Sequence, residues 1–391
     1  MGSSVPALLA ALALCAAAQP SPWDNAIDAC RSAYEQGRYV EAEKHCKAAL
    51  LEAESFEPKD PRLAATLDQT ITVYRTEGKL LAAEPYYHRL LGIQEATWGP
   101  QDLRLVTVLN GLGTLYTATR QWDQAESFYQ RALAIREKAL GGEHPDVAAT
   151  LESLASLAAV QARFDAAEAY YIRALGIRER SQGADHLSIA ATLDGLAGMY
   201  RDQGKYAAAE PLYRRALAIR EKALGPDHPE LVPSLDNLAW ICYAERKYAQ
   251  AEPLYGRSLL IWEKAVGNEH PTVATALDNL AGAYVAQEKF AEAEPLYQRA
   301  LLIREKSLLA NYDKLASAYV GDKKYAQAEQ VYQRALAVAE RSAIPDRVQI
   351  GMVLERYAEL LKMLNRQEEA ARMLARIRQI KQRLAHESSE P

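Results

Sequence analysis

Histidines recur every 42 residues in this sequence, at His144, His186, His228 and His270. Imidazole is a common zinc ligand and also titrates near neutral pH. If the four lie on stacked helices, they are at least about 8 to 10 Å apart, too far to share a zinc ion bound at about 2 Å. A histidine directly before a helix can instead accept hydrogen bonds from free N–H groups. The pattern predicts helix capping and no metal site, with a weak pH response as the alternative.

Motifs for catalysis are missing from the sequence. It contains no nucleophile elbow, no His-Glu-x-x-His run, no phosphate-binding loop and no dinucleotide fingerprint. Paired acids such as Glu292 and Glu294 belong to helix starts, where the helix dipole stabilises a carboxylate. The 46 Lys and Arg against 51 Asp and Glu give a net charge of −5, with no basic stripe for nucleic acid. The sequence therefore predicts a protein that is not an enzyme, holds no cofactor and binds no nucleic acid.

An internal repeat fills most of the 391 residues. The dipeptide Ala-Glu recurs about every 42 residues, and a Tyr follows its alanine by four residues in most repeats. Fixed periods of 20 to 50 residues indicate repeat architectures rather than separate domains. We predict nine units, at about residues 24–56, 61–98, 103–141, 145–183, 187–225, 229–267, 271–307, 308–342 and 345–384, with a disordered tail over 385–391. The anchoring alanines are Ala42, Ala83, Ala125, Ala167, Ala209, Ala251, Ala293, Ala328 and Ala370.

Each unit has the pattern of two amphipathic helices. Apolar residues at Leu235, Leu238 and Cys242 form one stripe, and a second helix is predicted over 248–266. Neither helix can bury its stripe alone, so the units must stack. The 22 Tyr against 4 Phe fit this core, because a Tyr buries its ring while its hydroxyl reaches a polar partner at the margin. The Tyr expected in the core are Tyr87, Tyr129, Tyr171, Tyr213, Tyr255, Tyr297 and Tyr332.

Segments 218–229 (AIREKALGPDHP), 234–239 (SLDNLA) and 251–255 (AEPLY) resemble the tetratricopeptide repeats of kinesin light chains and their bacterial relatives. The resemblance covers roughly residues 24–384. It implies an all-α, right-handed superhelical solenoid of stacked helical hairpins. It also implies a concave groove, lined by the first helices, that binds peptides or partner proteins.

One position on the first helix of each unit is almost always acidic, and the resemblance places this position in the groove. Such an acidic groove is expected to attract Lys- and Arg-rich segments. The alternative is that these acids are solvated or pair with neighbouring basic residues such as Arg201. The position is occupied by Asp68, Asn110, Glu152, Asp194, Asp236, Asp278, Asp313 and Glu355.

Asn237 and Asn279 occupy the next position of their units, where the resemblance implies contact with the backbone of a bound peptide. On the same helix as Asn237, Asp236, Trp240 and Tyr243 have i, i+4 and i+7 spacing and therefore share a face. Trp240 is predicted either to anchor a partner or to fill hollows left by Gly198 and Gly282 in the flanking units.

Cys30 and Cys46 occupy facing positions of the first predicted hairpin, so we predict a disulfide between them. Cys242 is expected to be a buried small residue. Seven residues are missing from the repeat between Lys306 and Tyr312, which predicts a local change of curvature there. The last unit is basic, with Arg372, Arg376, Arg378, Lys381 and Arg383, and could dock in the groove of another copy.

Residues 1–18 resemble an export signal, because an apolar run from Val5 ends in an Ala-x-Ala site at Ala18. The segment before the run has no Lys or Arg, and Cys15 leaves open whether the signal is cleaved or lipidated. We expect a periplasmic or extracellular protein with no membrane span once the signal is removed. A cytoplasmic location is the alternative if the segment is not a functional signal.

The sequence thus predicts a noncatalytic scaffold that binds a protein or peptide partner of basic character in an acidic groove. One alternative is a self-assembling homo-oligomer, in which the groove and the basic last unit contact each other. A second is an assembly subunit of an envelope enzyme complex.

Overall fold

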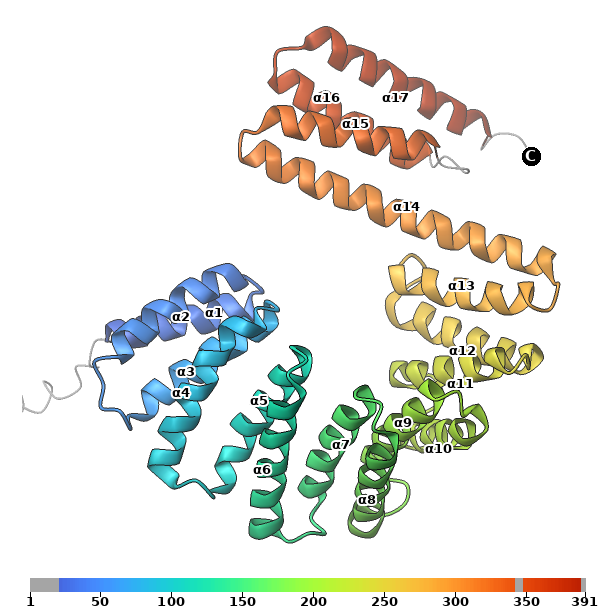
Figure 1. Cartoon of the computed structure of the whole chain (residues 1–391). Helices are drawn as coiled ribbons and strands as arrows, with labels where there is room; N and C mark the ends of the chain where they lie inside the picture. The colour runs from blue at the N-terminus through green and yellow to red at the C-terminus, as the bar shows by residue number, and fades with distance from the viewer. Residues whose placement is uncertain (1–20, 342–346, 388–391) are drawn as a thin grey trace, which may run out of the picture. The chain divides into compact units, whose positions relative to one another are not determined.

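The computed structural model describes residues 21–341 and 347–387. This part of the chain is built from α-helices with two short 3-10 helices and no strand, which confirms the predicted all-α fold (Figure 1). The whole predicted signal, including Cys15, lies outside the described residues. Helix α17 ends at Glu387, three residues into the segment predicted as a tail, and 388–391 are outside the description.

The chain divides into two compact units, the first ending at Gln203 and the second beginning at Gly204. Consecutive helices pack on one another in each unit and form stacked hairpins (Figure 1). The first unit contains α1 (Pro22–Glu35), α2 (Tyr39–Ala53), α3 (Pro61–Thr76), α4 (Leu80–Trp98), η1 (Leu103–Leu105), α5 (Val106–Ala118), α6 (Trp122–Leu140), α7 (Pro145–Val160), α8 (Phe164–Gln182) and α9 (Leu187–Asp202). The second contains α10 (Tyr206–Leu224), η2 (Pro229–Leu231), α11 (Val232–Ala244), α12 (Tyr248–Val266), α13 (Pro271–Val285), α14 (Phe290–Gly321), α15 (Tyr325–Arg341), α16 (Arg347–Met363) and α17 (Gln367–Glu387).

The recurring histidines cap helices, as predicted. Nδ1 of His144 accepts a hydrogen bond from the Asp146 N–H at 3.2 Å, at the start of α7. The equivalent bonds of the other three histidines measure 3.2 to 3.3 Å. An accepting Nδ1 carries no proton, so each neutral ring has its proton on Nε2. The histidines therefore stabilise the helix starts locally.

The repeated tyrosines form the core, with one exception. Tyr87 and Tyr171 are buried against Gly111 and Gly195, where an added Cβ would lie 2.5 and 2.7 Å from the rings. Tyr171 also reaches a polar partner at the margin, because its hydroxyl lies 3.1 Å from that of Ser156. The prediction is wrong for Tyr297, which is exposed.

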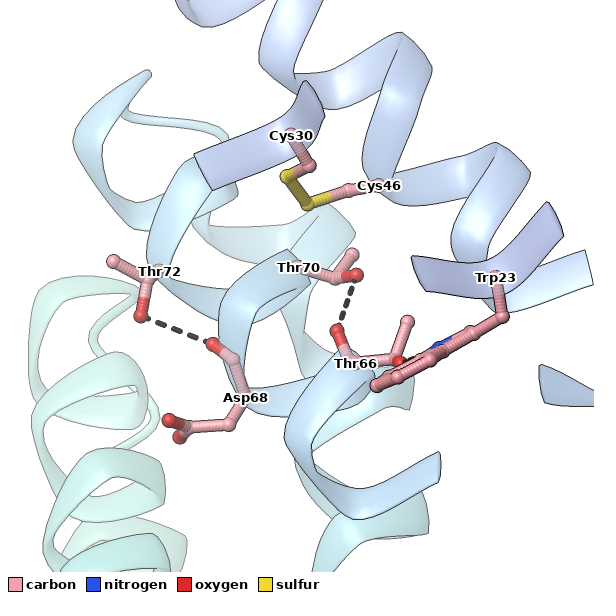
Figure 2. Close-up of a disulfide and its surroundings, with 7 residues drawn as sticks. All are labelled: Trp23, Cys30, Cys46, Thr66, Asp68, Thr70 and Thr72. Carbon is pink, nitrogen blue, oxygen red and sulfur yellow. Dashed lines mark hydrogen bonds between the residues drawn. A yellow bond between two sulfur atoms is a disulfide. The ribbon is translucent and has the colours of Figure 1, made fainter. Parts of the chain in front are cut away.

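A disulfide joins Cys30 on α1 to Cys46 on α2, with their Cα atoms 5.2 Å apart (Figure 2). Both cysteines are buried among small residues and Val73 of α3. Trp23 ties α1 to α3 as well, because its indole N–H donates to the Thr66 hydroxyl at 2.9 Å (Figure 2). The first hairpin is therefore fixed to the next helix by packing and by hydrogen bonds.

Helix α14 departs most from the predicted repeat. Two helices were expected to meet at residues 307 and 308, but α14 runs unbroken for 32 residues. The seven missing residues are those that would have formed the turn. The hydrophobic core is split at this place: Ala300 and Ile303 belong to one cluster of buried residues, and Leu309 and Ala316 belong to another. A shortened repeat therefore produces one long helix between two cores.

Candidate partner-binding site

The predicted groove residues lie on the first helices of the repeats, but their surroundings differ. What separates them is the residue 26 positions later, on the second helix of the same repeat. An arginine at that position can reach back to the acid. The acids and the residues that follow them by 26 are Asp68 and Gln94, Glu152 and Arg178, Asp194 and Arg220, Asp236 and Trp262, Asp278 and Arg304, Asp313 and Ala339, and Glu355 and Lys381; Asn110 is followed by Arg136.

Glu152 on α7 is held by Arg178 on α8 in a two-bond ion pair. Nε of Arg178 donates to Oε1 at 2.8 Å, and an Nη donates to Oε2 at 2.7 Å. The Thr192 hydroxyl of α9 donates to the same carboxylate. Both charged side chains are largely covered, with 12% and 23% of their surface exposed for Arg178 and Glu152. Glu152 therefore stabilises the stack and has little capacity left for a partner.

Two acids of the second unit are also engaged. Arg304 on α14 pairs with Asp278 on α13. Nε of Arg356 on α16 lies 3.9 Å from Oδ1 of Asp313 on α14. For Glu152, Asp278 and Asp313 the structure thus supports the alternative that groove acids pair with neighbouring arginines.

Asn110 is the one groove position without an acid, and the arginine of its repeat shows what this arginine binds when no carboxylate is present. Arg136 on α6, in the same repeat as Asn110, donates to the Thr150 hydroxyl at 2.5 Å and to the Asp146 carbonyl at 2.8 Å. Burial lowers the pKa of Arg136. The Asn110 side-chain oxygen is buried and accepts no hydrogen bond. An arginine at this place therefore binds whatever oxygens the neighbouring helices supply.

Asp68 and Asp236 lack this arginine. Burial raises the pKa of both carboxyl groups above the usual range. Asp68 lines a small pocket between α3, α4 and α5 with Arg75, whose charge counteracts that rise in its pKa. Among the described residues, no Lys or Arg pairs with Asp236; its buried Oδ1 accepts no hydrogen bond, and only the Ser258 hydroxyl counteracts the pKa rise. Within the described residues, Asp236 is therefore a groove carboxylate with little compensation for its charge.

The residues that share a face with Asp236 are open to solvent. Trp240 and Tyr243 on α11 are 43% and 38% exposed. Trp240 meets the Tyr206 ring edge-on at 5.7 Å, and Tyr243 meets Tyr248 at 5.1 Å. We refer to Asp236, Trp240 and Tyr243 as the Asp236 cluster. It presents one poorly compensated carboxylate beside two partly exposed rings.

The alternative prediction was that the Trp240 ring fills hollows beside Gly198 and Gly282, and the structure does not support it at Gly282. A Cβ built on Gly282 would meet only the Tyr297 hydroxyl within 4 Å, at 3.9 Å. The Trp240 ring therefore does not fill the hollow at Gly282. Filling of the hollow at Gly198, which belongs to the first unit, stays a prediction.

The two asparagines next to the groove acids are half-buried on α11 and α13. No hydrogen bond within the described chain uses the Asn279 side-chain amide. Elsewhere the same slot packs on a core ring: Tyr87 lies against Gly111 and Tyr171 against Gly195. This slot therefore borders the buried Tyr of the preceding repeat.

Some basic residues of the last unit form ion pairs within the chain. Arg376 pairs with Glu340 at 2.5 Å, and an Nη of Arg372 lies 4.0 Å from Glu368. The side chain of Arg383 lies outside the described residues. No described helix has the length and apolar character needed to cross a membrane.

The arginine 26 positions after the acid is the functional signal that sequence reasoning missed. It recurs with the same 42-residue period as the histidines, at Arg136, Arg178 and Arg220 and again at Arg304, whereas the other groove positions are followed by Gln94, Trp262, Ala339 and Lys381. Glu152 and Asp278 are each followed by an arginine 26 residues later, whereas Asp236 is not, so the spacing in the sequence already distinguishes Asp236 from these two acids.

Stacked helical hairpins with a recurrent small and aromatic core define this chain as an α-helical repeat protein. The chain belongs to the tetratricopeptide repeat family, which it matches over residues 71–138, 104–180, 146–222, 188–259, 243–306 and 307–383. These segments overlap and extend from residue 71 to residue 383. The predicted family is thereby confirmed.

Solved structures of repeat proteins are similar to the chain. A Podosopora anserina kinesin light chain-type protein with nearly identical repeats is 26% identical, covering 53% of this chain and 97% of that one, with a TM-score of 0.48. BtubC from P. vanneervenii is 24% identical over 62% of this chain and 90% of that one, with a TM-score of 0.48. Aspartyl phosphate phosphatase F from Bacillus subtilis is 13% identical over 93% and 94%, with a TM-score of 0.48. No curated protein matches the sequence.

Proposed function

We propose that this protein is a noncatalytic scaffold that holds a Lys- or Arg-containing segment of a partner protein against α11, with the Asp236 cluster as the anchor. Its general role as a protein-interaction scaffold follows from its membership of the tetratricopeptide repeat family. The basic character of the partner is our proposal. The observation that carries it is the raised pKa of Asp236 in a position where other repeats pair the acid with arginine.

A cation is the group that best compensates this carboxylate. Desolvation makes the charged form of Asp236 costly in the free protein, and an ammonium or guanidinium group would favour that form. In the repeat of Glu152, the protein itself supplies such a group from Arg178. At Asp236 the corresponding residue is Trp262, which packs with the core cluster around Tyr255. We propose that a partner supplies the cation that the repeat lacks.

The aromatic rings of the Asp236 cluster suit the same ligand. A Lys or Arg side chain placed over an indole or phenol face is attracted by the ring quadrupole, and its methylene groups pack on the ring. The edge-on contact with Tyr206 leaves part of the Trp240 surface open, as its exposure shows. A partly exposed Trp beside a carboxylate is also typical of residues that contribute most to protein–protein binding.

Asn237 and Asn279 are proposed to position the backbone of the bound segment. Each follows its groove acid by one residue, on α11 and α13. An amide both donates and accepts, so it can bind a peptide group of an extended chain whatever its side chains are. This arrangement would fix the segment while the Asp236 cluster selects one basic side chain.

We further propose that the protein is exported. The apolar segment ending at Ala18 supports this, and the Cys30–Cys46 disulfide is of the kind that persists in oxidising compartments. Fractionation of the source cells, with N-terminal sequencing of the protein recovered, tests it. Recovery in the cytosol with the first 18 residues attached contradicts it.

Crosslinking mass spectrometry on cells that express the full chain tests the scaffold directly. The wild type is expected to capture a reproducible partner through crosslinks near α11 and α13. Trp240→Ala is expected to weaken binding of that partner about thirtyfold, since truncating an anchoring Trp costs about 2 kcal/mol or more. The melting temperature separates binding from folding. Loss of stability without loss of binding would make Trp240 a packing residue and contradict the proposal.

A further inference from the structure

An exposed apolar stripe runs along α14, on residues that the proposed function does not use. Its members are spaced so that, at 100° per residue, they fall within an arc of about 40° on the helix. At 1.5 Å per residue the stripe is about 37 Å long. We call Phe290, Tyr297, Leu301, Leu308 and Leu315 the α14 stripe; all are classed as exposed.

Two of these positions are buried one repeat earlier. Tyr297 is 42% exposed, whereas Tyr255, one repeat earlier, is 6% exposed. Leu301 is 45% exposed, whereas Leu259 is 7% exposed. The residue types are unchanged, so these side chains are core residues without a cover.

The far end of the stripe shows the same loss of burial. Leu315 is 44% exposed, and its equivalent Leu280 on α13 is 7% exposed. In a regular repeat such a leucine lies in the core between two hairpins. Here it lies beyond the point where the two clusters of buried residues separate. Both halves of α14 therefore present core residues to solvent on one face.

The cause is the shortened repeat. In the preceding repeat, a turn at Gly267 lets α13 fold back and cover α12, burying Tyr255 and Leu259 beside Val273 and Leu277. The seven missing residues remove that turn from α14, which continues straight to Gly321. The helix that should cover Tyr297 and Leu301 has become the extension of their own helix. The stripe thus marks the place of an absent first helix.

The ion pair of Arg304 on α14 with Asp278 indicates which polar residue a helix covering the α14 stripe would carry. In complete repeats the following helix brings a hydroxyl to the arginine or its acid: Thr150 accepts from Arg136, and Thr192 donates to Glu152. Ser234 accepts from Arg220 in the same way. Arg304 pairs with Asp278, but the residue 14 positions after Arg304 is Ala318, on the same helix. The pair therefore lacks the hydroxyl that a covering helix brings.

We infer that the α14 stripe docks an amphipathic helix of a partner protein, which takes the place of the absent first helix. The occupant is a helix of about four turns with Leu and Ala on one face and a Ser or Thr directed at Arg304. This is the chemistry of the chain's own first helices, such as α9 with Thr192, Leu193 and Leu196. The stripe is separate from the Asp236 cluster, and the inference does not depend on the proposed function.

A peptide of residues 187–202, fluorescein-labelled and with blocked ends, is the probe for this surface. In the protein this segment is α9, which packs on α8. Fluorescence polarisation with the full chain is expected to show saturable binding, at least tenfold weaker for the Leu301→Asp variant. Leu260→Asp is the matched control, because Leu260 is an exposed leucine on α12 outside the stripe. It is expected to bind the peptide as the wild type does.

Further controls show whether the peptide binds through its apolar face and through the stripe. A peptide with Leu193→Asp and Leu196→Asp is expected not to bind, and Trp240→Ala in the protein is expected to leave binding unchanged. Circular dichroism melting of Leu301→Asp establishes that it is folded, and Leu308→Ser is the second variant if it is not. Absence of binding, or equal binding by the wild type and both stripe variants, overturns the inference. So does a dimer in sedimentation velocity that Leu301→Asp dissociates, because the stripe would then be covered by a second copy.

Discussion

Glu152 in the first unit and Asp236 in the second occupy the same repeat position, yet they behave as different kinds of residue. The carboxylate of Glu152 receives two bonds from Arg178 and one from Thr192. No arginine of the described residues pairs with Asp236, and burial raises its pKa. We therefore expect an acid in a repeated groove position to bind a partner only where its own repeat leaves the charge uncompensated.

Removing Glu152 gives the largest effect that this comparison predicts. Glu152→Ala leaves Arg178 unpaired and largely covered, at a cost of about 2 kcal/mol in the free energy of unfolding. Chemical denaturation, with hydrogen exchange of α7 and α8 to localise the change, measures it. Glu143→Ala is the control, since its pair with Arg180 is well exposed and is expected to contribute no more than about 1 kcal/mol. Equal losses for the two variants would show that Glu152 is as weakly used as a surface charge.

An arginine placed opposite Asp236 should compensate its charge in the way that Arg178 compensates the charge of Glu152. Trp262→Arg is expected to pair with Asp236, lower its pKa and weaken binding of a basic partner segment about tenfold. Trp262→Gln is the matched control, because Gln94 occupies this position in the repeat of Asp68 and carries no charge. Binding is measured by titration calorimetry and folding by thermal melting. Unchanged affinity in a folded Trp262→Arg variant would separate Asp236 from the binding site.

The pH dependence of binding should differ between the two regions. Asp236 has a raised pKa in the free protein, and a bound cation favours its charged form. Affinity for a basic segment is therefore expected to fall as the pH drops through that pKa, because binding must then release a proton. Asp236→Asn should remove this dependence, whereas Glu152→Gln should leave it in place. A pH profile that is the same in wild type and Asp236→Asn would place the titrating group elsewhere.

The smallest expected effect is on stability. A carboxyl group whose pKa is higher in the folded than in the unfolded state destabilises the fold at pH above both values. Asp236→Asn should therefore raise the melting temperature slightly at pH 7, and the gain should vanish as the pH falls through the folded pKa. A fall in melting temperature at pH 7 would mean that the Asp236 charge stabilises the unbound protein.

Sequence reasoning worked where one residue type serves one local role. The capping histidines, the buried ring of Tyr255 and the facing positions of Cys30 and Cys46 all follow from repeat period and helix geometry. The predicted burial of Tyr297 is wrong, because burial depends on whether a neighbouring helix folds back and covers the ring. Two helices were expected to meet at residues 307 and 308, but helical propensity continued across the gap and gave one helix. The predicted change of curvature stays a prediction.

The roles of the predicted groove residues were harder to predict from the sequence. An acid such as Glu152 or Asp236 carries the same charge in the sequence whether or not an arginine lies opposite. Its role depends on a residue 26 positions away on another helix, and the periodicity of Arg178 and Arg304 shows this only once the helices are paired. Exposure of Trp240 likewise depends on the packing of its neighbours rather than on its spacing.

Binding of three matched peptide sets tests the central claim most directly. Extended 15-residue peptides, identical except for Lys or Arg, Gln, or Glu at the centre, are titrated into the full chain and into Asp236→Asn. If Asp236 binds a cation of the partner, the Lys and Arg set binds the wild type at least tenfold more tightly than the Glu set, and Asp236→Asn removes most of this preference. Equal affinity for the three sets, or a preference that survives in Asp236→Asn, would contradict it.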